Sequence, residues 1–195
     1  MKRVVIIQGH PDPKGSHFCH ALADAYARGA EAAGIDLTQL VVAQLDFPLL
    51  RTKEDWETGA VPPDIQRAQQ AVLRADHLVI IWPLWLGAMP AILKAFLEQV
   101  FRPGLAGIKN APGKMAWQSV LKGKTARIVV TMGMPALIYR WYFGAHSLKS
   151  LERNILRFSG IGRIHETIIG MVEAGGPKRH TRLLEKLERY GRQGR

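Results

Sequence analysis

Residues 9–18 combine residue types that suit binding of an anion. They read Gly-His-Pro-Asp-Pro-Lys-Gly-Ser-His-Phe and join an apolar run to an Ala-rich helical pattern. Unpaired backbone N–H groups at the start of a helix attract an anion, and His10 and Ser16 add a ring donor and a hydroxyl donor. The segment matches neither Gly-x-Gly-x-x-Gly nor Gly-x-x-x-x-Gly-Lys-Ser/Thr, so it supports neither a dinucleotide Rossmann site nor an NTPase. It predicts a phosphate site; the simpler alternative is a helix cap with a structural histidine.

Residues 82–90, Trp-Pro-Leu-Trp-Leu-Gly-Ala-Met-Pro, suit a flat aromatic ligand. The segment offers backbone donors beside apolar walls, which would hold such a ligand by stacking and by hydrogen bonds at its edge. The alternative is a core loop in which Trp82 and Trp85 close the end of a sheet. Residues 131–135, Thr-Met-Gly-Met-Pro, are a weaker third candidate for the same crevice.

The elements that must position these segments alternate between β-branched apolar runs and helical periodicity. Strands are expected over residues 4–7, 36–42, 77–82, 125–131 and 164–169. Helices are expected from a cap at Ser16 through Ala33, over residues 64–75, 90–101 and 139–158, and over a basic stretch at 181–190. Residues 46–58 are interpreted as irregular and residues 102–123 as a long loop. This alternation predicts an α/β protein with a doubly wound, three-layer, five-stranded parallel sheet, whose ligands bind at the carboxyl ends of the strands.

Composition narrows the class of protein further. The chain has 195 residues, of which 47% are hydrophobic and 22% charged, as in one folded domain over residues 1–195. Cys19 is the only cysteine, which excludes a disulfide framework. The apolar run at residues 78–93 is too short to span a membrane and contains Pro83, Gly87 and Pro90. The apolar run after the first three residues has only four residues, which is too short for a secretory signal, so we expect a cytoplasmic location.

The basic charge is concentrated in the second half of the chain. Residues 1–100 contain 9 Lys and Arg against 11 Asp and Glu, whereas residues 101–195 contain 18 against 5. Such a field favours anionic partners, although a basic face that only aids solubility is equally compatible. No nucleic-acid-binding motif accompanies it, so nucleic acid is an unlikely partner. The last helix, with Leu183, Leu184 and Leu187, is interpreted first as an amphipathic docking helix.

Histidine and cysteine give no metal pattern. Cys19, His20 and His17 are close in sequence, but Cys19 and His20 would point about 100° apart on a helix. The 7 histidines show no HExxH-type spacing. We therefore expect no metal site.

Taken together, the three segments resemble the flavodoxin-like NAD(P)H:quinone oxidoreductases, over residues 4–170. The most specific match is the run from Ala75 to Lys94, ADHLVIIWPLWLGAMPAILK, which is similar to the family pattern aDlvi…PlwwgsmPaiLK. The resemblance implies a flavodoxin-like fold with strand order 2-1-3-4-5. It also implies a homodimer, with residues 102–123 as a candidate for reaching the partner.

The resemblance also implies the site. His10, Ser16, His17 and Phe18 would hold the flavin phosphate. Residues 83–86 would contact the isoalloxazine with a backbone N–H near N5, and residues 131–134 would border its pyrimidine edge. These two groups comprise Pro83, Leu84, Trp85, Leu86, Thr131, Met132, Gly133 and Met134.

Tyr139 and His146 resemble the catalytic pair of the family, which would stabilise the negative charge that hydride transfer leaves on the flavin. The spacing between them is one residue longer than in the mammalian form, so Tyr142 is an alternative to Tyr139. Met134 replaces a family glycine and narrows its loop, which favours FMN, with FAD possible. Phe18 replaces a common asparagine, and Arg140, Lys178 and Arg179 are weak candidates for contact with NADPH.

The expected function is therefore flavin-dependent, ping-pong reduction of quinones or similar acceptors by NAD(P)H. The apolar wall of the acceptor pocket would include Trp82, Trp85 and Met89. Two alternatives stay open. One is a flavin-binding regulatory subunit of a membrane transporter with little turnover, docked through the basic half at the membrane. The other is a polyanion-binding module without flavin.

Overall fold

The structure, a computed structural model, describes residues 1–15, 17–106, 108–111, 114–117 and 119–195. Ser16 lies outside these residues, so its role in binding phosphate stays a prediction. Side chains of the segment 106–118 are likewise outside the description.

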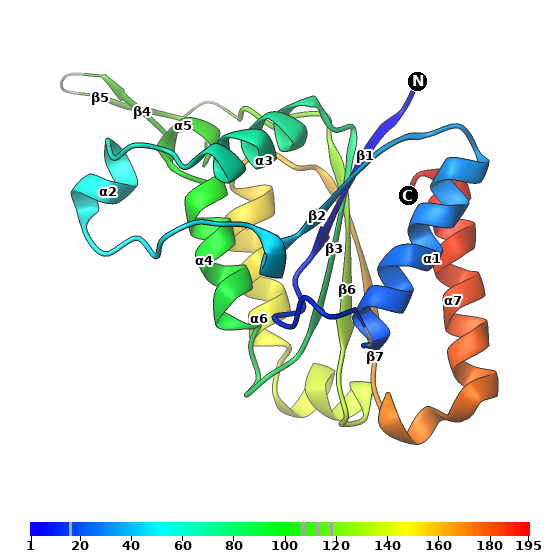
Figure 1. The fold of residues 1–195 in the computed structure, drawn as a ribbon. Coiled ribbons are helices and arrows are strands. Elements are labelled where there is room, and N and C mark those ends of the chain that lie inside the picture. Colours follow the sequence, from blue (N-terminus) through cyan, green and yellow to red (C-terminus); the bar gives the residue numbers. More distant parts are fainter. Residues whose placement is uncertain (16, 107, 112–113, 118) are drawn as a thin grey trace.

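A five-stranded parallel sheet forms the centre of the molecule (Figure 1). Its strands are β1 (Arg3–Gln8), β2 (Asp36–Val41), β3 (His77–Pro83), β6 (Thr125–Thr131) and β7 (Arg163–Ile169). They lie in the order β2-β1-β3-β6-β7, and every neighbouring pair is parallel. Continuous β-branched runs such as that of β1 are typical of strands covered on both faces. The predicted fold class, order 2-1-3-4-5, is confirmed.

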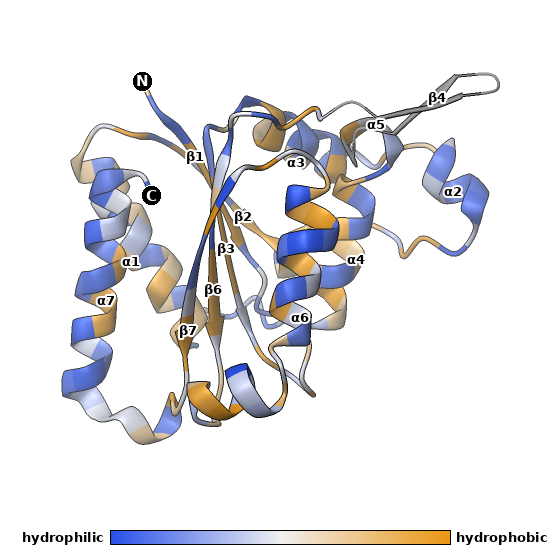
Figure 2. Ribbon diagram, turned by 180° about the vertical axis from the view of Figure 1, so that it is seen from behind, coloured by the Kyte–Doolittle hydropathy of each residue, from blue (hydrophilic) through white to orange (hydrophobic). Residues whose placement is uncertain are grey.

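Helices cover both faces of the sheet, which completes three layers (Figure 1). Helices α1 (Phe18–Ala32) and α7 (Gly176–Gln193) lie on one face, and α3 (Pro63–Arg74), α4 (Ala91–Val100) and α6 (His146–Lys149) lie on the other. Figure 2 shows the strands mostly hydrophobic in the middle of the molecule, and hydrophilic residues on the outer surfaces of α1 and α7. Hydrophobic burial against the sheet therefore holds each helix layer in place.

Close contact between α1 and α7 depends on two glycines. A Cβ on Gly29 would lie 2.0 Å from the carbonyl oxygen of Glu188, and one on Gly191 would lie 2.0 Å from that of Tyr26. Only glycine lets the two backbones approach so closely. Leu187 is fully buried between the helices and the sheet, which confirms the interpretation of the last helix as an amphipathic docking helix.

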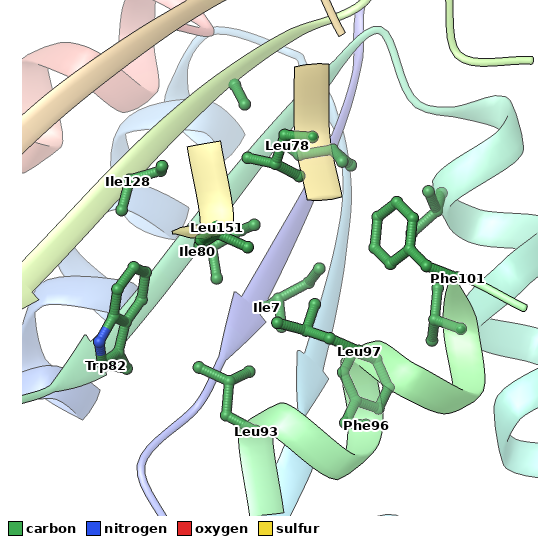
Figure 3. Close-up of a cluster of buried hydrophobic side chains, with 14 of the residues drawn as sticks. Ile7, Leu78, Ile80, Trp82, Leu93, Phe96, Leu97, Phe101, Ile128 and Leu151 are labelled. Carbon is green, nitrogen blue, oxygen red and sulfur yellow. The ribbon is translucent and has the colours of Figure 1, made fainter. Parts of the chain in front are cut away.

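The larger hydrophobic cluster lies between the sheet and the layer of α3, α4 and α6. Figure 3 shows Ile7, Leu78, Ile80 and Ile128 from the strands meeting Leu93, Phe96 and Leu97 from α4. Trp82 belongs to this cluster, and none of its surface is exposed. The strand that carries Trp82 is thereby fixed at its carboxyl end, next to residues 83–90.

Two segments expected to lack regular structure are partly ordered. Residues 46–58 contain α2 (Lys53–Glu57), whose start is capped reciprocally by Thr52 and Asp55. Residues 102–123 contain α5 (Pro103–Ala106) and the antiparallel strands β4 (Ile108–Ala111) and β5 (Lys114–Trp117). Both predictions of irregular structure were wrong, because short capped turns and hairpins need little hydrophobic periodicity.

Three helix boundaries also differ from expectation. The N-cap of α1 is His17, not Ser16. The helix expected over residues 139–158 is interrupted, since Gly144 and Ala145 have φ of +64° and +49° and such left-handed residues end a right-handed helix. A π-helical segment (Ile138–Tyr142) precedes this break, and α6 and a second π-helical segment (Ser150–Arg157) follow it. Helix α7 begins at Gly176 instead of residue 181, with a proline in its first turn.

Within the residues that the structure describes, no helix is both long and apolar enough to cross a membrane.

Candidate functional site

A cleft with a volume of about 480 Å³ opens at the carboxyl edge of the sheet. Because the strands are parallel, the loops after β1, β3, β6 and β7 meet at this edge, in the lower part of Figure 1. The volume lies within the usual range for small-molecule and cofactor sites. The lining residues are His10, Asp12, His17, Phe18, Cys19, Pro83, Leu84, Trp85, Thr131, Met132, Gly133, Val172 and Glu173.

The cleft brings together all three segments singled out in the sequence. His10, His17 and Phe18 line it from the first segment, three residues from the second, and Thr131, Met132 and Gly133 from the third. Leu86 and Met134 are not among the lining residues: Leu86 is fully exposed, and Met134 packs against the larger hydrophobic cluster. The distant segments therefore form one site, with fewer contributors than expected.

The start of α1 forms the cationic end of the cleft. The N–H groups of Phe18 and Cys19, the first two residues of this 15-residue helix, have no backbone acceptor in the described part of the chain, whereas that of His20 donates to the His17 oxygen at 2.9 Å. The helix dipole favours an anion at this end. His10 Nδ1 accepts a hydrogen bond of 3.1 Å from the N–H of Asp12. The proton of the neutral His10 ring is thereby assigned to Nε2, which becomes a donor. His10 is buried, with 7% of its surface exposed.

Three imidazoles gather at this end. The rings of His10 and His17 stack with centroids 4.0 Å apart, and that of His20 lies 5.2 Å from His10 and 5.8 Å from His17. Burial, and then the charge of His17, lowers the pKa of His10 and likewise that of His20. His17 Nε2 lies 2.9 Å from Asp12 Oδ2, and this hydrogen bond lowers the pKa of Asp12. Near neutral pH, His10 and His20 are therefore mainly neutral.

The second segment forms the apolar wall. Pro83, Leu84 and Trp85 line the cleft, and Trp85 is half exposed, with its ring edge-on to that of His10. The Leu84 N–H donates to the Thr131 oxygen, and the Trp85 N–H donates to the Ala88 oxygen. Among residues 83–86, the N–H of Leu86 is left without an acceptor in the described part of the chain. This makes it the free backbone donor of the segment.

The cleft also carries a carboxylate beside its third segment. Glu173 Oε2 would lie 3.1 Å from a Cβ on Gly133, so the carboxylate rests directly against the third segment. Cys19 Sγ lies 3.2 Å from Thr131 Oγ1, and burial raises the pKa of this thiol to about 11. The cleft thus has a cationic end at α1 and an acidic group at Glu173.

Helix α7 holds the loop that carries Glu173. The Arg179 guanidinium donates to the carbonyl oxygens of Gly170 and Met171, at 2.7 and 2.8 Å, and His180 Nε2 lies 2.7 Å from the Val172 oxygen. Met171 has a φ of +53°. Positive φ at a non-glycine residue is strained and is common at functional sites. Through these contacts Arg179 has a structural role, since it holds the loop after β7.

Several other predicted residues lie away from the cleft. Tyr139 has 1% of its surface exposed, and its hydroxyl accepts from the Leu148 N–H at 3.3 Å. His146 is exposed at the start of α6. Neither is among the lining residues, and Arg140 forms an ion pair with Glu166. The interpretation of Trp82 as a wall of the pocket was wrong, because its side chain enters the core beneath the cleft.

Sequence reasoning missed four lining residues: Asp12, Cys19, Val172 and Glu173. Asp12 lies within the first segment, and Cys19 follows it directly as the second residue of α1. Its position in the first turn of the helix expected there could have placed Cys19 at the same edge of the sheet. Val172 and Glu173 follow the last strand, whose carboxyl end reaches the same edge of the sheet. No local motif marks Glu173. In the described part of the chain no group of histidine, cysteine and carboxylate side chains has the arrangement of a metal site.

The fold and the cleft together define a flavodoxin-like α/β protein with a ligand site at the carboxyl edge of its sheet. The chain belongs to the family described as flavodoxin-like fold, whose model matches residues 2–193.

Individual relatives share this organisation. The chain is 26% identical over 185 residues to a protein of Haemophilus influenzae named uncharacterized NAD(P)H oxidoreductase, covering 93% of this chain and 90% of that one. Its fold matches the NAD(P)H:quinone oxidoreductase from Methanothermobacter marburgensis with a TM-score of 0.79 and 22% identity, over 98% and 96% of the two chains. It also matches an FMN-dependent NADH-azoreductase from Bacillus anthracis in complex with FMN, with a TM-score of 0.68 and 14% identity, over 99% of each chain.

Proposed function

We propose that the protein is a flavin-dependent NAD(P)H oxidoreductase that reduces quinones or similar acceptors. One observation carries this proposal: a single cleft has a phosphate-attracting helix start at one end and an apolar wall with an aromatic ring beside it. A flavin mononucleotide has matching parts, since its phosphate and its flat ring system need these two environments. The names of the relatives support the same class of reaction.

The described residues fit such a cofactor. His10, His17 and the first turn of α1 would hold the phosphate, with Ser16 as a further predicted contact. Pro83, Leu84 and Trp85 would lie against the ring system, and the free N–H of Leu86 would supply the edge hydrogen bond. Residues 131–133 would border the pyrimidine edge. Glu173 would accept a hydrogen bond from a ribityl hydroxyl or from the ring N3–H.

FMN is the proposed cofactor, because the cleft offers one helix start for a phosphate, and the Glu173 carboxylate beside Gly133 would repel a second phosphate. When bound, the flavin takes up a hydride from NAD(P)H, with two electrons, and passes them to the acceptor. The half-exposed Trp85 leaves one open face beside the apolar wall. Both reactants would use that face in turn, which gives ping-pong kinetics.

Other features of the prediction stay proposals. Residues 1–195 are treated as one flavin-binding domain. A homodimer would cover exposed apolar side chains that follow β3 and β6, namely Leu86, Leu137, Trp141 and Tyr142. Tyr139 and His146 have no contact with the cleft in this structure, so their catalytic role needs the test below. A cytoplasmic location and contact with a transporter or membrane are predictions without a carrying observation.

The test begins with the purified protein and added FMN, FAD or riboflavin. We expect FMN fluorescence to change on binding, and the complex to oxidise NADH or NADPH when a quinone is present. Initial rates over a grid of both substrates should give parallel double-reciprocal lines. Binding of no flavin would overturn the proposal and favour a polyanion-binding module; flavin binding with negligible turnover would favour the regulatory alternative.

Matched variants locate the site. Trp85→Ala should weaken FMN binding about tenfold, in line with the loss of an aromatic contact of 1–2 kcal/mol. Trp56→Ala removes an equally large side chain from α2, away from the cleft lining and from the proposed dimer surface, and should leave FMN affinity within about twofold. Tyr139→Phe and His146→Ala test the catalytic pair: a tenfold or larger fall in the rate of flavin reduction, with FMN affinity unchanged, would support the role.

A further inference from the structure

His20 is a buried histidine behind the phosphate end of the cleft. It has 8% of its surface exposed, and neither ring nitrogen has a hydrogen-bond partner in the described part of the chain. Buried polar atoms usually have a hydrogen-bond partner, so two ring nitrogens without one on the same side chain call for a specific explanation. His20 is the third residue of α1, in its first turn, and does not line the cleft. Any effect on a ligand must therefore pass through the rings that it touches.

Those rings are His10 and His17, both of which line the cleft. The three centroids are 4.0 to 5.8 Å apart. Cationic rings at this separation repel one another, so protonation of one ring opposes protonation of the other two. His10 is more than nine-tenths buried, and its Nε2–H has no acceptor in the described part of the chain. This donor and the helix start are two independent features that suit an oxyanion at the same end.

Other charged groups around the cluster do not cancel this effect. Asp12 is within hydrogen-bond distance of His17 and also accepts from the Lys14 N–H. It raises the pKa of His10 and of His20, but less than burial and the charge of His17 lower them. Asp24, on α1, favours a charged His20 only weakly compared with burial and His17, which oppose it. Cys19 is a neutral thiol, and Glu173 faces the cleft beside Gly133. No lysine or arginine lines the cleft among the described residues, which leaves the histidines as its titratable cations.

We propose that the cluster of His10, His17 and His20 binds a phosphate monoester together with a proton, and that His20 is a positioning residue which sets this coupling. The inference rests on the proposed function only in taking the phosphate to be that of FMN. The negative charge of the bound phosphate offsets the repulsion between the rings, so a ring that is neutral in the free protein gains a proton in the complex.

The direction of the pH dependence follows from this uptake. In the free protein, His10 and His20 have pKa values below that of an ordinary histidine. A dianion beside His10 and His20 raises their pKa values. At a pH between their pKa values in the free protein and those in the complex, the complex therefore holds more protons than the free protein. By linkage, affinity then increases as the pH falls through that window, by up to tenfold per pH unit for each proton taken up. Measurements should stay above pH 6.5, because a phosphate monoester itself gains a proton near pH 6.

The experiment compares FMN with riboflavin, which lacks the phosphate, between pH 8.5 and 6.5. We expect the Kd of FMN to fall at least about threefold over this range and that of riboflavin to stay within about 1.5-fold. Proton uptake on binding FMN, measured calorimetrically in buffers of different ionisation enthalpy, should match the slope. An FMN affinity that is independent of pH, or an equal slope for riboflavin, would overturn the proposal.

His20→Phe tests the positioning role. The variant keeps an aromatic ring in the same place, but it removes one titratable ring and the positive charge that this ring brings beside His10 when it is protonated. The pH slope for FMN should fall to less than about half, while FMN still binds at pH 8.5. His165→Gln, at an exposed histidine on β7, is the matched control and should keep the full slope. A full slope in His20→Phe would overturn the role of His20.

A direct readout separates this inference from the flavin function. NMR can follow the ring resonances of the cluster in the wild-type protein over the same pH range. Inorganic phosphate should raise the pKa values at which these rings titrate. Failure to bind any flavin, with the phosphate shift present, would overturn the proposed function and support the cluster. No shift of any cluster resonance with phosphate would overturn the cluster inference itself.

Discussion

The two faces of the sheet are built from different kinds of residue. On the side of α3, α4 and α6 the inward side chains of β1, β3 and β6 are apolar, as in Ile7, Leu78, Ile80 and Trp82, and the buried polar residues Gln99 and Arg102 lie at the end of α4. On the side of α1 and α7, buried polar groups interrupt the apolar ones, among them Gln8, His77, Arg127, Thr131 and Thr167. The cationic end of the cleft is a continuation of this second face. One face therefore supplies packing, and the other combines packing with the polar groups from which a site can be made.

Side-chain hydrogen bonds pair some of the buried polar groups on this polar face. Arg127 donates to Thr167 Oγ1 at 3.0 Å and to the Arg195 oxygen at 3.0 Å, and its guanidinium lies 3.7 Å from the centroid of the Tyr190 ring. His77 Nδ1 lies 2.7 Å from Thr125 Oγ1. At the cleft, Cys19 and Thr131 form a separate pair on the same face. Since buried polar groups contribute stability only when paired, substitutions on the two faces should differ in kind.

The largest effect is expected on the apolar face. Phe96→Ala removes a fully buried ring from α4 and should lower the free energy of unfolding by about 3–5 kcal/mol. Urea denaturation measures this loss, and the folded variant should bind FMN as the wild type does. Leu73→Ala, at a side chain of α3 that is 43% exposed, is the control and should cost less than about 1 kcal/mol. Similar losses for the two variants would show that the core does not have the packing described.

His77 on the polar face should make stability depend on pH. Burial, chiefly, lowers the pKa of His77 to about 3, so the ring stays neutral in the folded protein where an unfolded histidine takes up a proton below about 6.5. The unfolded state then binds more protons. The contribution of the neutral ring is complete above pH 6.5 and is lost as the pH falls towards 3, by up to about 1.4 kcal/mol per pH unit.

The variant His77→Asn isolates this contribution, because asparagine can still face Thr125 and does not titrate. The free energy of unfolding, measured at pH 7, 6 and 5, should fall less steeply in the variant than in the wild type. His146→Asn, at an exposed position, should keep the wild-type slope. Equal slopes in all three proteins would mean that His77 is protonated in the folded state.

The contrast between the faces explains what the sequence could predict. Runs such as that of β1 and the alternation with helical periodicity depend only on neighbouring residues, and they predicted the sheet, the helix layers and the edge where the cleft lies. The three segments followed, because the carboxyl ends of parallel strands share an edge. Local pattern does not predict which side chains at the end of a strand enter the core and which line the cleft. Trp82 enters the core, whereas Trp85, three residues later, lines the cleft.

Contacts between distant segments were beyond the sequence. Glu173 reaches the cleft because α7 holds the loop after β7 against Gly133, through Arg179 and His180. Tyr139 follows a proline and a short apolar stretch that resemble a cleft loop, yet its hydroxyl accepts a hydrogen bond inside the core. Such outcomes depend on how whole layers pack, which no local pattern records.

A smaller effect is expected where the polar face is sealed by α7. Gly191→Ala would place a Cβ against the Tyr26 carbonyl oxygen, so α1 and α7 must move apart, at a cost of about 1–3 kcal/mol. Alanine is favoured over glycine inside a helix by about 1 kcal/mol, which offsets part of this loss. Gly162→Ala has free space around its Cβ and serves as the control. Thermal unfolding should show a lower Tm for Gly191→Ala alone; an unchanged Tm would mean that the two helices are not in such close contact.

The smallest effect concerns Cys19, where the polar face meets the cleft. Its thiol lines the cleft but is 2% exposed, and burial raises its pKa to about 11. The thiolate is the reactive form, so at pH 8 the folded protein should react with iodoacetamide at least about tenfold more slowly than the urea-unfolded chain. Thr131→Val removes the hydroxyl partner and should leave this protection in place, because burial and not the hydrogen bond causes it. Rapid alkylation of the folded wild type would show that the cleft opens at Cys19 and that the polar face is not sealed there.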